Sequence, residues 1–447
     1  MSENLSQTGI LSSFSKFDVS TDQITGYDSF ETFNTKVSQI LSDTPTIDYA
    51  LYYVNVKNFK LINETFGHSI GDKTLIEISN VLNKYLKEDE AFARVISDTF
   101  VMFKRHTSIP QQSSTFNSIT DEIKRNCTFI QNKYFIDFSA GIIIIDKENR
   151  DLSVSKLIDR AIIAIKNTPD KQGTHYTYYE DNLRKAYLYQ ASLENNMYNA
   201  LADGEFLPYL QPKFNITNNK IIGSEALVRW QSPINGFMGP DSFIPIFEKN
   251  GFIAEIDLYM LEQVCKTFRE YLMNNYPIYP CSVNLSRVTL NHPDLILRIK
   301  CIVEEYRIPT EYIEFEITEN VFVSDHNAII NTLNELKSLG FVISTDDFGS
   351  GYSSLISLKD LPIDVLKLDR QFLDADTTNP NTYHIMKSII DMSKLLNIKV
   401  VCEGVETETQ AAFLKDIGCE VGQGYLFAKP MPISDFNTML RNDIRNK

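Results

Sequence analysis

The second half of the chain alternates short apolar runs with amphipathic segments, and this alternation limits the folds that it can adopt. The apolar runs have the length of strands, as at 341–348, and the segments between them carry apolar residues at helical spacing, as at 328–339 and 385–396. This pattern indicates parallel strands joined by helices. Over a segment of about 250 residues it predicts an eight-stranded (β/α) barrel, in which functional side chains gather at the C-terminal strand ends. A doubly wound open sheet is the alternative, although it would gather ligands at one switch point.

Two adjacent carboxylates close the apolar run that begins at Phe341. They are Asp346 and Asp347, and a glycine-containing loop follows them directly. Because like charges at this spacing repel, a divalent cation that prefers oxygen ligands is the usual partner of such a pair. A solvated Asp-Asp turn is the alternative for this run alone. Other apolar runs carry carboxylates, amides and a lysine that favour a metal site: Glu225, Asn284, Glu316, Glu319, Lys367, Glu403, Glu406 and Gln423.

Motifs on these runs resemble the EAL family of bacterial cyclic-di-GMP phosphodiesterases, and they occur in the order that the family has them. They are Glu225–Trp230 (EALVRW), Asn284–Ser286 (NLS), Glu316–Glu319 (EITE), Asp346–Leu355 (DDFGSGYSSL), Lys367–Asp369 (KLD), Glu403–Glu406 (EGVE) and Gln423–Tyr425 (QGY). A single Glu-Ala-Leu tripeptide would mean little, because it is common in helices. Together the motifs span about half of the chain. The resemblance implies a TIM-like (β/α)8 barrel that hydrolyses cyclic-di-GMP to linear 5′-pGpG.

The resemblance also implies roles for the residues of the predicted site. Two Mg²⁺ or Mn²⁺ ions would be held, one by Glu225, Asn284, Glu316 and Asp346, and the other by Asp346, Asp347 and Glu403. Lys367 would orient the attacking water or neutralise charge near it, and Glu319 would anchor the loop 348–353. The residues with catalytic roles are then Glu225, Asp347, Lys367, Glu319 and Glu403. Substrate contacts would come from Gln211, Arg229, Glu406 and Gln423. The alternative for Lys367 is a surface lysine at a strand end.

Net charge restricts the partners of the chain. The 447 residues carry a formal net charge of −15, which argues against a nucleic-acid polymer, because such a partner needs a basic track. A small dianionic nucleotide remains compatible with this charge, since metal ions invert the local field of a pocket. The family resemblance further implies a homodimer formed through the EAL halves.

The sequence predicts a cytoplasmic protein without a membrane span. No apolar run approaches the ~20 residues of a membrane helix, and the N-terminus lacks the basic start and apolar core of a signal peptide. The six cysteines include no closely spaced pair typical of a zinc or redox motif. We therefore expect buried thiols in a reducing compartment.

The N-terminal third has the pattern of a separate α/β domain. Aromatic and β-branched residues predict strands at 49–56 and 135–145, a hairpin turns at 96–98, and 58–71 is predicted as a polar turn before a helix. Two segments resemble the GGDEF family, the diguanylate cyclase fold: Asp22–Tyr27 (DQITGY) and Asn58–Asp72 (NFKLINETFGHSIGD). The resemblance implies a nucleotidyl-cyclase-like domain.

The signature of the GGDEF family is altered in this chain. Its pentapeptide corresponds to 96–100 (ISDTF), where both glycines are replaced by larger residues at the hairpin tip that must approach phosphate. Thr99 replaces an acid, and Asn55 stands where the family has a metal-binding Asp. Because a neutral amide is a weak ligand for Mg²⁺, we expect no cyclase activity. The family's feedback site is not kept either, since its Arg and Asp correspond to Lys87 and Glu90.

The positions that the GGDEF family uses for guanine recognition resemble the family more closely than the altered signature does. Asn63 and Asp72 match residues that the GGDEF family uses for the base. The domain would then bind GTP as an allosteric ligand without converting it, or it would be a dimerisation module only, and both interpretations stay open. The structural alternatives are a turn stabiliser for Asn63 and a helix N-cap for Asp72.

The predicted organisation is a degenerate GGDEF domain at 1–180 with a short N-terminal lead-in, a linker helix at 181–203 and an EAL phosphodiesterase domain at 204–447. The alternative to hydrolysis is a non-catalytic cyclic-di-GMP receptor. Loss of a metal ligand would favour a receptor, and every family position for a ligand is occupied by a suitable residue. A bifunctional cyclase-phosphodiesterase is disfavoured by Asn55 and Thr99.

Overall fold

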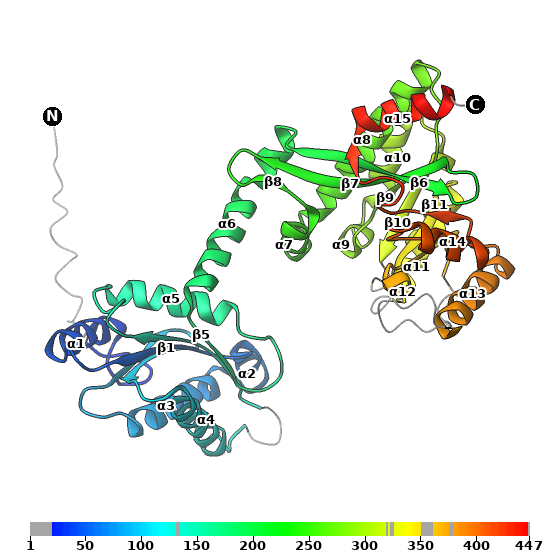
Figure 1. Ribbon diagram of the computed structural model, residues 1–447. Helices are drawn as coiled ribbons and strands as arrows, with labels where there is room; N and C mark the ends of the chain where they lie inside the picture. The colour runs from blue at the N-terminus through cyan, green and yellow to red at the C-terminus, as the bar shows by residue number, and fades with distance from the viewer. Residues whose placement is uncertain are drawn as a thin grey trace, which may run out of the picture. The chain divides into compact units, whose positions relative to one another are not determined.

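The computed structural model describes residues 20–130, 135–318, 321, 326–349, 361–374 and 380–445. The chain divides into two compact units, Met1–Ala191 and Ser192–Lys447. The division falls within α6 (Asp181–Ala202), which begins at the residue where the linker helix is predicted to begin (Figure 1). Each unit has its own sheet and its own hydrophobic core.

The first unit is built on a five-stranded sheet with the order β2-β3-β1-β4-β5. The strands are β1 (Tyr49–Val56), β2 (Ala91–Ile96), β3 (Thr99–Arg105), β4 (Phe138–Ile145) and β5 (His175–Tyr178). β1 is central and pairs antiparallel with β3 and β4, whereas β5 runs parallel to β4. The predicted hairpin is confirmed, because β2 and β3 pair antiparallel and the turn residue Ser97 has a φ of 50°.

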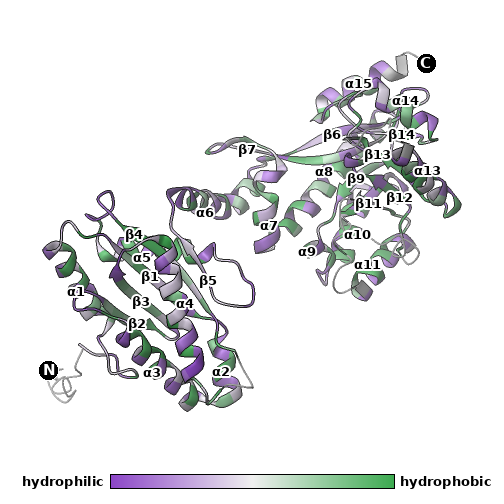
Figure 2. Ribbon diagram, turned by 60° about the horizontal axis from the view of Figure 1, so that its bottom comes forward, coloured by the Kyte–Doolittle hydropathy of each residue, from purple (hydrophilic) through white to green (hydrophobic). Residues whose placement is uncertain are grey.

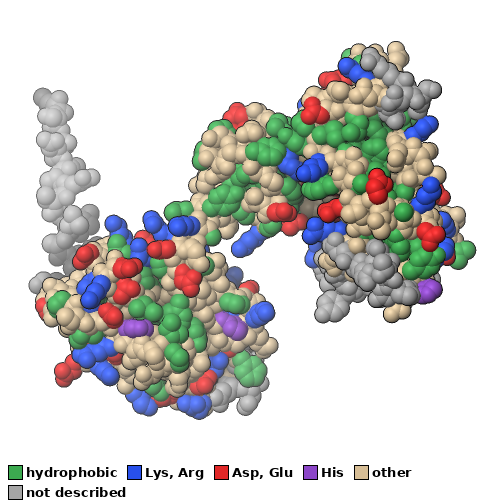
Figure 3. All heavy atoms as spheres, in the orientation of Figure 1, with side chains coloured by type: hydrophobic (Ala, Val, Ile, Leu, Met, Phe, Trp, Pro, Cys, Tyr) green, Lys and Arg blue, Asp and Glu red, His purple; other side chains and the backbone are tan. Residues whose placement is uncertain are grey.

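Helices cover both faces of this sheet. They are α1 (Phe30–Asp43), α2 (Phe59–Phe66), α3 (His68–Lys84), α4 (Ile109–Asn126) and α5 (Val154–Lys166). Alternate residues of β1 enter two hydrophobic clusters: Ala50 and Tyr52 pack with α3 and α4, whereas Tyr49 and Leu51 pack with α1 and α5. Figure 2 shows largely hydrophobic strands between helices that carry both hydrophobic and hydrophilic residues. On the face of this unit drawn in Figure 3, basic and acidic side chains are interspersed.

The prediction of a polar turn at 58–71 is wrong. Most of that segment is helical, because α2 occupies Phe59–Phe66 and α3 begins at His68. Phe59 and Ile62 are buried on one side of α2, and this burial stabilises the short helix. The many polar residues of the segment led to the prediction of a turn.

The second unit contains a closed barrel. Its ten-stranded sheet has the order β15-β6-β14-β13-β12-β11-β10-β9-β7-β8, and a further pairing of β6 with β7 closes it. The strands are β6 (Phe206–Asn215), β7 (Lys220–Ser232), β8 (Gly236–Met238), β9 (Cys281–Asn284), β10 (Ile313–Thr318), β11 (Val342–Phe348), β12 (Val365–Leu368), β13 (Lys399–Cys402), β14 (Val421–Gly422) and β15 (Met431–Pro432). β8 and β15 extend single strands, β7 and β6, so the remaining strands form the predicted eight-stranded barrel.

One barrel strand runs against its neighbours. β7 and β9 to β14 pair in parallel, but β6 is antiparallel to both β7 and β14. The short turn 216–219 joins β6 to β7, and a connection of this length allows only antiparallel pairing, because a parallel pair needs a crossover of a dozen or more residues. The expectation of parallel strands is therefore wrong for β6.

Helices cover the outside of the barrel. They are α7 (Ile244–Asn250), α8 (Ile253–Met273), α9 (Arg287–Leu290), α10 (Leu295–Tyr306), α11 (His326–Ser338), α12 (Gln371–Asp374), α13 (Pro380–Leu395), α14 (Glu408–Asp416) and α15 (Ile433–Arg445), with the 3-10 turns η1 (Pro240–Ser242) and η2 (Thr310–Tyr312). Val228 and Trp230 of β7 share one hydrophobic cluster with Leu258 and Leu261 of α8.

The structure bears on the predicted lack of a membrane span and on the predicted burial of the cysteines. Among the helices that the structure describes, none is both long enough and apolar enough to cross a bilayer. The cysteines are all free thiols, and Cys301 on α10 is exposed whereas the others are buried. The expected burial is therefore wrong for Cys301.

Candidate active site

The C-terminal ends of the barrel strands bring predicted metal ligands together. Glu316 on β10 lies opposite Asn284 of β9 in the parallel register, and Glu225 lies on the neighbouring strand β7. The residues that follow the two glutamates, Ala226 and Ile317, belong to the hydrophobic core. Because successive side chains of a strand point to opposite faces, Glu225 and Glu316 point into the barrel.

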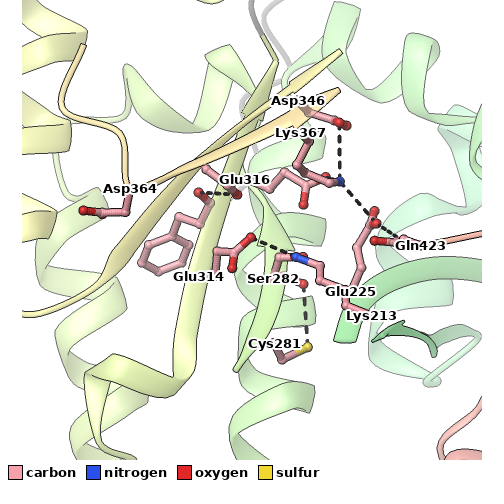
Figure 4. Close-up of polar contacts among 12 residues, drawn as sticks. Lys213, Glu225, Cys281, Ser282, Glu314, Glu316, Asp346, Asp364, Lys367 and Gln423 are labelled. Carbon is pink, nitrogen blue, oxygen red and sulfur yellow. Dashed lines mark hydrogen bonds and ion pairs between the residues drawn. The ribbon is translucent and has the colours of Figure 1, made fainter. Parts of the chain in front are cut away.

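Lys367 of β12 lies at the centre of the acidic cluster and is fully buried, with 0% of its surface exposed. Its Nζ lies 2.5 Å from a carboxylate oxygen of Glu316 and 2.5 Å from one of Glu403, which directly follows β13. The same nitrogen lies 3.3 Å from Glu225 and 3.4 Å from Asp346 (Figure 4). The alternative of a surface lysine is therefore wrong, and Lys367 joins carboxylates from β7, β10, β11 and the end of β13.

Burial and mutual charge shift the pKa values of the side chains in this cluster. Burial lowers the pKa of Lys367, but the carboxylates of Glu225, Glu316 and Glu403 outweigh it and hold that pKa well above its usual range. Burial raises the pKa of Glu316 well above its usual range, and the charge of Glu225 adds to this effect. Burial also raises the pKa of Glu403, to about 7, although Lys367 acts against it. Four carboxylates around one ammonium thus leave an excess of negative charge.

The residues of the cluster fit a divalent cation. Glu225, Glu316 and Glu403 each offer a carboxylate oxygen, and these oxygens lie within 4.8 Å of one another. Oε2 of Glu316 is buried and has no hydrogen-bond partner in the described part of the chain. Hard cations such as Mg²⁺ and Mn²⁺ prefer oxygen donors of this kind. The acidic cluster is therefore suited to a metal ion, and a metal site at these strands was predicted from the sequence.

Two buried glutamines hold Glu225 in place. Nε2 of Gln423 donates to Oε2 of Glu225 at 2.6 Å and to Oε1 of Gln211 at 3.1 Å. Gln211 in turn donates to the backbone carbonyl of Ala428 at 3.2 Å. Both glutamines were predicted as substrate contacts, and the structure adds a second task, because they fix the orientation of a candidate metal ligand.

A pocket of about 270 Å³ opens over the cluster. It is lined by Gln211, Glu225, Leu227, Asp346, Arg370, Glu403, Gly404, Glu406, Gln423, Gly424 and Tyr425. The predicted residues Gln211, Glu406 and Gln423 thus share one pocket with the acidic cluster. Arg370 and Tyr425 also line the pocket and were not among the predicted site residues, although Arg370 directly follows the motif Lys367–Asp369 and Tyr425 ends the motif Gln423–Tyr425.

Gly404 permits the close approach of Arg370 to the pocket. Its φ of +66° lies in the left-handed region, and a Cβ at this position would lie 2.3 Å from Cβ of Arg370. Any side chain at this position would therefore push the Glu403 segment away from the end of β12.

Arg229 lies beside the pocket and is not one of the residues that line it. Its guanidinium lies over the ring of Tyr209, 5.6 Å from the centroid, and Nη1 donates to the carbonyl of Val228 at 2.8 Å. Burial lowers the pKa of Arg229, although the nearby Tyr209 acts against this. The predicted substrate contact is thus a half-buried guanidinium stacked on an aromatic ring.

Some predicted site residues lie outside the description. Glu319 and residues 350–353 of the loop 348–353 that it was predicted to anchor lie outside the described residues. The backbone of Asp347 belongs to β11, but its side chain also lies outside them. The roles predicted for Glu319 and Asp347 remain predictions.

In the first unit, the two residues that replace cyclase acids bond to each other. Asn55 and Thr99 are opposite in the register of β1 and β3, and Nδ2 of Asn55 donates to Oγ1 of Thr99 at 3.2 Å. A neutral amide-hydroxyl pair therefore occupies the strand position where the family has carboxylates. Glu90, which the resemblance places at the family's feedback position, is buried and pairs with Lys104 at 2.7 Å, so it has a structural role.

The two candidate guanine-binding residues lie on consecutive helices. Asn63 is half-buried on α2, and Asp72 is exposed on α3. A Cβ at Gly71 would lie 1.9 Å from Oδ1 of Asn63, so the glycine leaves room for the amide beside the first turns of α3. The alternative of an N-cap is wrong for Asp72, because Gly67 occupies that position.

Comparisons with known proteins extend along most of the chain. Family models match residues 194–430 (EAL domain) and 19–172 (diguanylate cyclase, GGDEF domain). Two relatives from Pseudomonas aeruginosa are the bifunctional diguanylate cyclase/cyclic di-GMP phosphodiesterase MucR, 29% identical over 86% of this chain and 56% of MucR, and the cyclic di-GMP phosphodiesterase NbdA, 28% identical over 94% of this chain and 54% of NbdA. The chain thus spans little more than half the length of these relatives.

Solved structures agree with the family models. The PaMucR phosphodiesterase in its c-di-GMP complex is 35% identical with a TM-score of 0.52, over 55% of this chain and 99% of that chain. The EAL enzyme Bd1971, bound to cAMP and cyclic-di-GMP, is 27% identical with a TM-score of 0.55, over 77% of this chain and 82% of that chain. The resemblances predicted from the motifs are confirmed. The chain belongs to the EAL domain family and carries a GGDEF domain ahead of its EAL domain.

Proposed function

We propose that this protein hydrolyses cyclic-di-GMP to linear 5′-pGpG in the pocket of its second unit. The observation that carries the proposal is the cluster of four carboxylates around Lys367 beneath that pocket. Relatives whose names state cyclic-di-GMP phosphodiesterase activity, and a related phosphodiesterase solved in a c-di-GMP complex, support the same substrate.

The proposed cofactors are two Mg²⁺ or Mn²⁺ ions. Glu225, Asn284, Glu316 and Asp346 would hold one ion, and Asp346, Asp347 and Glu403 would hold the other. When bound, such ions lower the pKa of water and stabilise the charge that develops on the attacking and leaving oxygens of a phosphodiester. Oε2 of Glu316 is buried and has no hydrogen-bond partner among the described residues, which supports this assignment, because a buried anionic oxygen needs a compensating partner.

The chain's own residues would position the substrate and the carboxylates. Lys367 would keep the carboxylates close together and place one positive charge beside the phosphodiester. Gln423 and Gln211 would fix Glu225 through the hydrogen bonds that join them. Glu406 and Arg370 line the pocket and Arg229 lies beside it. These residues would contact the nucleotide, with the forked guanidinium groups suited to phosphate or to a base edge.

The proposal is tested by incubating the purified full chain with cyclic-di-GMP and Mg²⁺ and separating the nucleotides by anion-exchange chromatography. Formation of pGpG that EDTA abolishes is the expected result. Binding of cyclic-di-GMP without cleavage, in Mg²⁺ and in Mn²⁺ and with or without GTP, would contradict hydrolysis and leave the receptor alternative.

For the first unit we propose regulation without synthesis. Asn55 and Thr99 bond to each other and cannot supply the anionic ligands that a cyclase needs. GTP would bind through Asn63 and Asp72 as an allosteric ligand, and the alternative is a dimerisation module alone. Chromatography of products after incubation with GTP distinguishes a cyclase, which forms cyclic-di-GMP, from a domain that leaves GTP unchanged.

We also propose a homodimer that forms through the second units. Assembly beside the Asp347 loop would tie the geometry of the metal site to the oligomeric state. Sedimentation velocity and the hydrolysis assay at the same protein concentration test this point. A monomer with full activity would contradict it.

A further inference from the structure

Asn284 is the only amide among the proposed metal ligands. It is the last residue of β9, and its neighbours Val283 and Leu285 belong to the hydrophobic core. Because successive side chains of a strand alternate between its faces, Asn284 points into the barrel, as Glu316 on the paired strand does. A neutral amide is a weak ligand for a hard cation. Its contribution to metal binding therefore depends on how well the backbone places it.

The amide of Asn284 takes its position from the backbone. In the described part of the chain, no hydrogen bond joins this side chain to another residue. The segment 284–286 is held on one side by β10, because the N–H of Leu285 donates to the backbone carbonyl of Glu316 at 2.8 Å. This bond keeps the segment beside a second candidate ligand.

Asp257 of α8 holds the segment 284–286 on its other side. Its carboxylate is buried, and Oδ2 accepts the backbone N–H of Ser286 at 2.8 Å. The same oxygen accepts the hydroxyl of Thr289 at 2.5 Å. Thr289 is also buried, so water does not compete for these bonds. Hydrogen bonds to a buried carboxylate are stronger than bonds between neutral groups.

Capping of α9 does not explain this carboxylate. Ser286 is the N-cap of α9, and its own Oγ accepts the N–H of Thr289 at 3.1 Å. The residues on either side of Asp257, Ile256 and Leu258, belong to the hydrophobic core. An apolar side chain at this place would avoid the free-energy cost of burying a carboxylate. What Asp257 adds is a fixed acceptor for the backbone that leaves β9.

We propose that Asp257 is a positioning residue of the metal site, which aims Asn284 at the cation by holding the N–H of Ser286. The inference rests on the proposed function, because it requires Asn284 to be a metal ligand. Asp257 lies on a helix outside the barrel and acts only through the segment 284–286. The geometry requires an acceptor at Oδ2, which an asparagine also offers, and an N–H at position 286.

The test measures the Kd of Mn²⁺ for the full chain by titration calorimetry without nucleotide, and the Mg²⁺ dependence of cyclic-di-GMP hydrolysis. Asp257→Leu removes the acceptor and should raise the Mn²⁺ Kd about tenfold, because residues that orient metal ligands typically contribute about 10–100-fold to affinity. The Mg²⁺ concentration that gives half the maximal rate should rise by a similar factor. Asp257→Asn keeps an oxygen at the same place and should keep the wild-type Kd.

A double variant separates positioning from general destabilisation. Asn284→Ala removes the ligand itself, so adding Asp257→Leu to it should leave the Mn²⁺ Kd of Asn284→Ala unchanged. Val264→Ala is the matched control, because Val264 is buried on the same helix, two turns from Asp257. Its truncation should lower the thermal stability without removing a hydrogen bond of the segment 284–286, and the Mn²⁺ Kd should equal that of the wild type.

Ser286→Pro tests the same bond from the donor side, whether or not Asp257→Leu folds. Ser286 has a φ of −70°, which proline adopts, so the substitution removes the N–H with little backbone strain. Ser286→Ala is its control, because it loses the hydroxyl and keeps the N–H. The Mn²⁺ Kd should rise in Ser286→Pro and remain at the wild-type value in Ser286→Ala.

The outcomes separate the positioning role from the reaction. Wild-type Mn²⁺ affinity in Asp257→Leu, Ser286→Pro or Asn284→Ala, or a further loss in the double variant, would overturn the positioning role and leave hydrolysis standing. Mn²⁺ binding that weakens as expected, in a protein that does not cleave cyclic-di-GMP, would support the positioning role and overturn the proposed function. Absence of Mn²⁺ binding by the wild type would overturn both.

Discussion

Lys367 is buried among the carboxylates of Glu225, Glu316, Asp346 and Glu403, and it supplies the positive charge that makes their burial tolerable. Removing one partner from a buried ionic cluster typically lowers the free energy of unfolding by about 3–5 kcal/mol, because the remaining charges stay buried without compensation. A bound divalent cation can supply the positive charge that these carboxylates need.

We therefore predict that Lys367→Met lowers the melting temperature of the second unit in EDTA by about 5–10 °C, and that Mn²⁺ restores most of this loss. Differential scanning calorimetry with and without Mn²⁺ measures both effects. Lys337→Met is the control, because Lys337 pairs with Asp364 at 2.7 Å at the surface, outside the cluster, and such pairs contribute about 1 kcal/mol or less. A Mn²⁺ response in Lys367→Met no larger than that of the wild type would contradict the account.

Asp257 on α8 gives a pH-dependent prediction. Burial raises its pKa to about 7, although the backbone N–H of Ser286 and the hydroxyl of Thr289 donate to it. The folded state therefore holds a proton that the unfolded state has released, so this contribution to stability is full below pH 4 and is lost as the pH rises through about 7.

Replacing Asp257 by Asn removes this titration and keeps the shape of the side chain. The free energy of unfolding of the wild type, relative to Asp257→Asn, should fall by about 2 kcal/mol between about pH 5 and about pH 8. Urea titrations of both proteins at the two pH values measure the difference, in which other titrating groups cancel. A difference that is independent of pH would refute the raised pKa.

The residue types of the candidate site could be predicted from the sequence, but their packing could not. Carboxylates at strand ends predicted an acidic cluster, and Glu225, Glu316 and Glu403 do meet. The hydrogen bond from Gln423 to Glu225 could not be foreseen, because it joins residues that are far apart in sequence across the closed barrel. Arg370 was missed because its approach depends on the left-handed backbone of Gly404.

At the scale of the strands, an ion pair crosses the barrel below the acidic cluster. Lys213 of β6 donates to Glu314 of β10 at 2.9 Å, and both side chains are buried (Figure 4). Gly223 lies opposite Lys213 in the β6–β7 register, and a Cβ at this glycine would lie 3.0 Å from the backbone carbonyl oxygen of Pro280. Buried pairs of this kind contribute little net stability, but removing one partner leaves an uncompensated charge.

Glu314→Leu alone should therefore lower the free energy of unfolding by about 3–5 kcal/mol, whereas the double variant Lys213→Met/Glu314→Leu should recover most of it. Urea unfolding of the wild type, both single variants and the double variant gives the coupling free energy. Additive effects of the two substitutions would show that the pair does not act as a unit.

The elements themselves were predicted with unequal success. Strand ranges such as β1 followed from runs of aromatic and β-branched residues, and the barrel followed from the alternation of runs. The antiparallel direction of β6 could not be predicted from hydrophobic periodicity, because this periodicity is the same in parallel and antiparallel strands. Only the short turn 216–219 fixes the direction of the strand. α2 was missed because buried Phe59 and Ile62 stabilise it through tertiary contacts.

At the scale of the whole molecule, the first unit carries Asn55 and Thr99 where we expect the acids of a cyclase, and it carries the candidate base-recognition residues Asn63 and Asp72. If GTP prefers one state of the protein over another by ~1–3 kcal/mol, the active population changes several-fold. GTP should then raise cyclic-di-GMP hydrolysis, and Asp72→Ala should abolish the stimulation without changing basal hydrolysis. Asp121→Ala, an exposed acid on α4, is the control. Stimulation that persists in Asp72→Ala would contradict GTP recognition through Asp72, and calorimetry that shows no GTP binding would reduce the first unit to a scaffold or dimerisation module.

The central claim is that the acidic cluster around Lys367 cleaves cyclic-di-GMP, and a comparison of Glu225→Gln with Glu311→Gln tests it most directly. Both substitutions remove one carboxylate, but Glu225 belongs to the cluster and Glu311 is exposed on η2. Chromatographic measurement of pGpG in Mg²⁺ should show a loss of about 100-fold or more in Glu225→Gln. Glu311→Gln should keep the wild-type rate. Near-wild-type hydrolysis by Glu225→Gln would contradict the account.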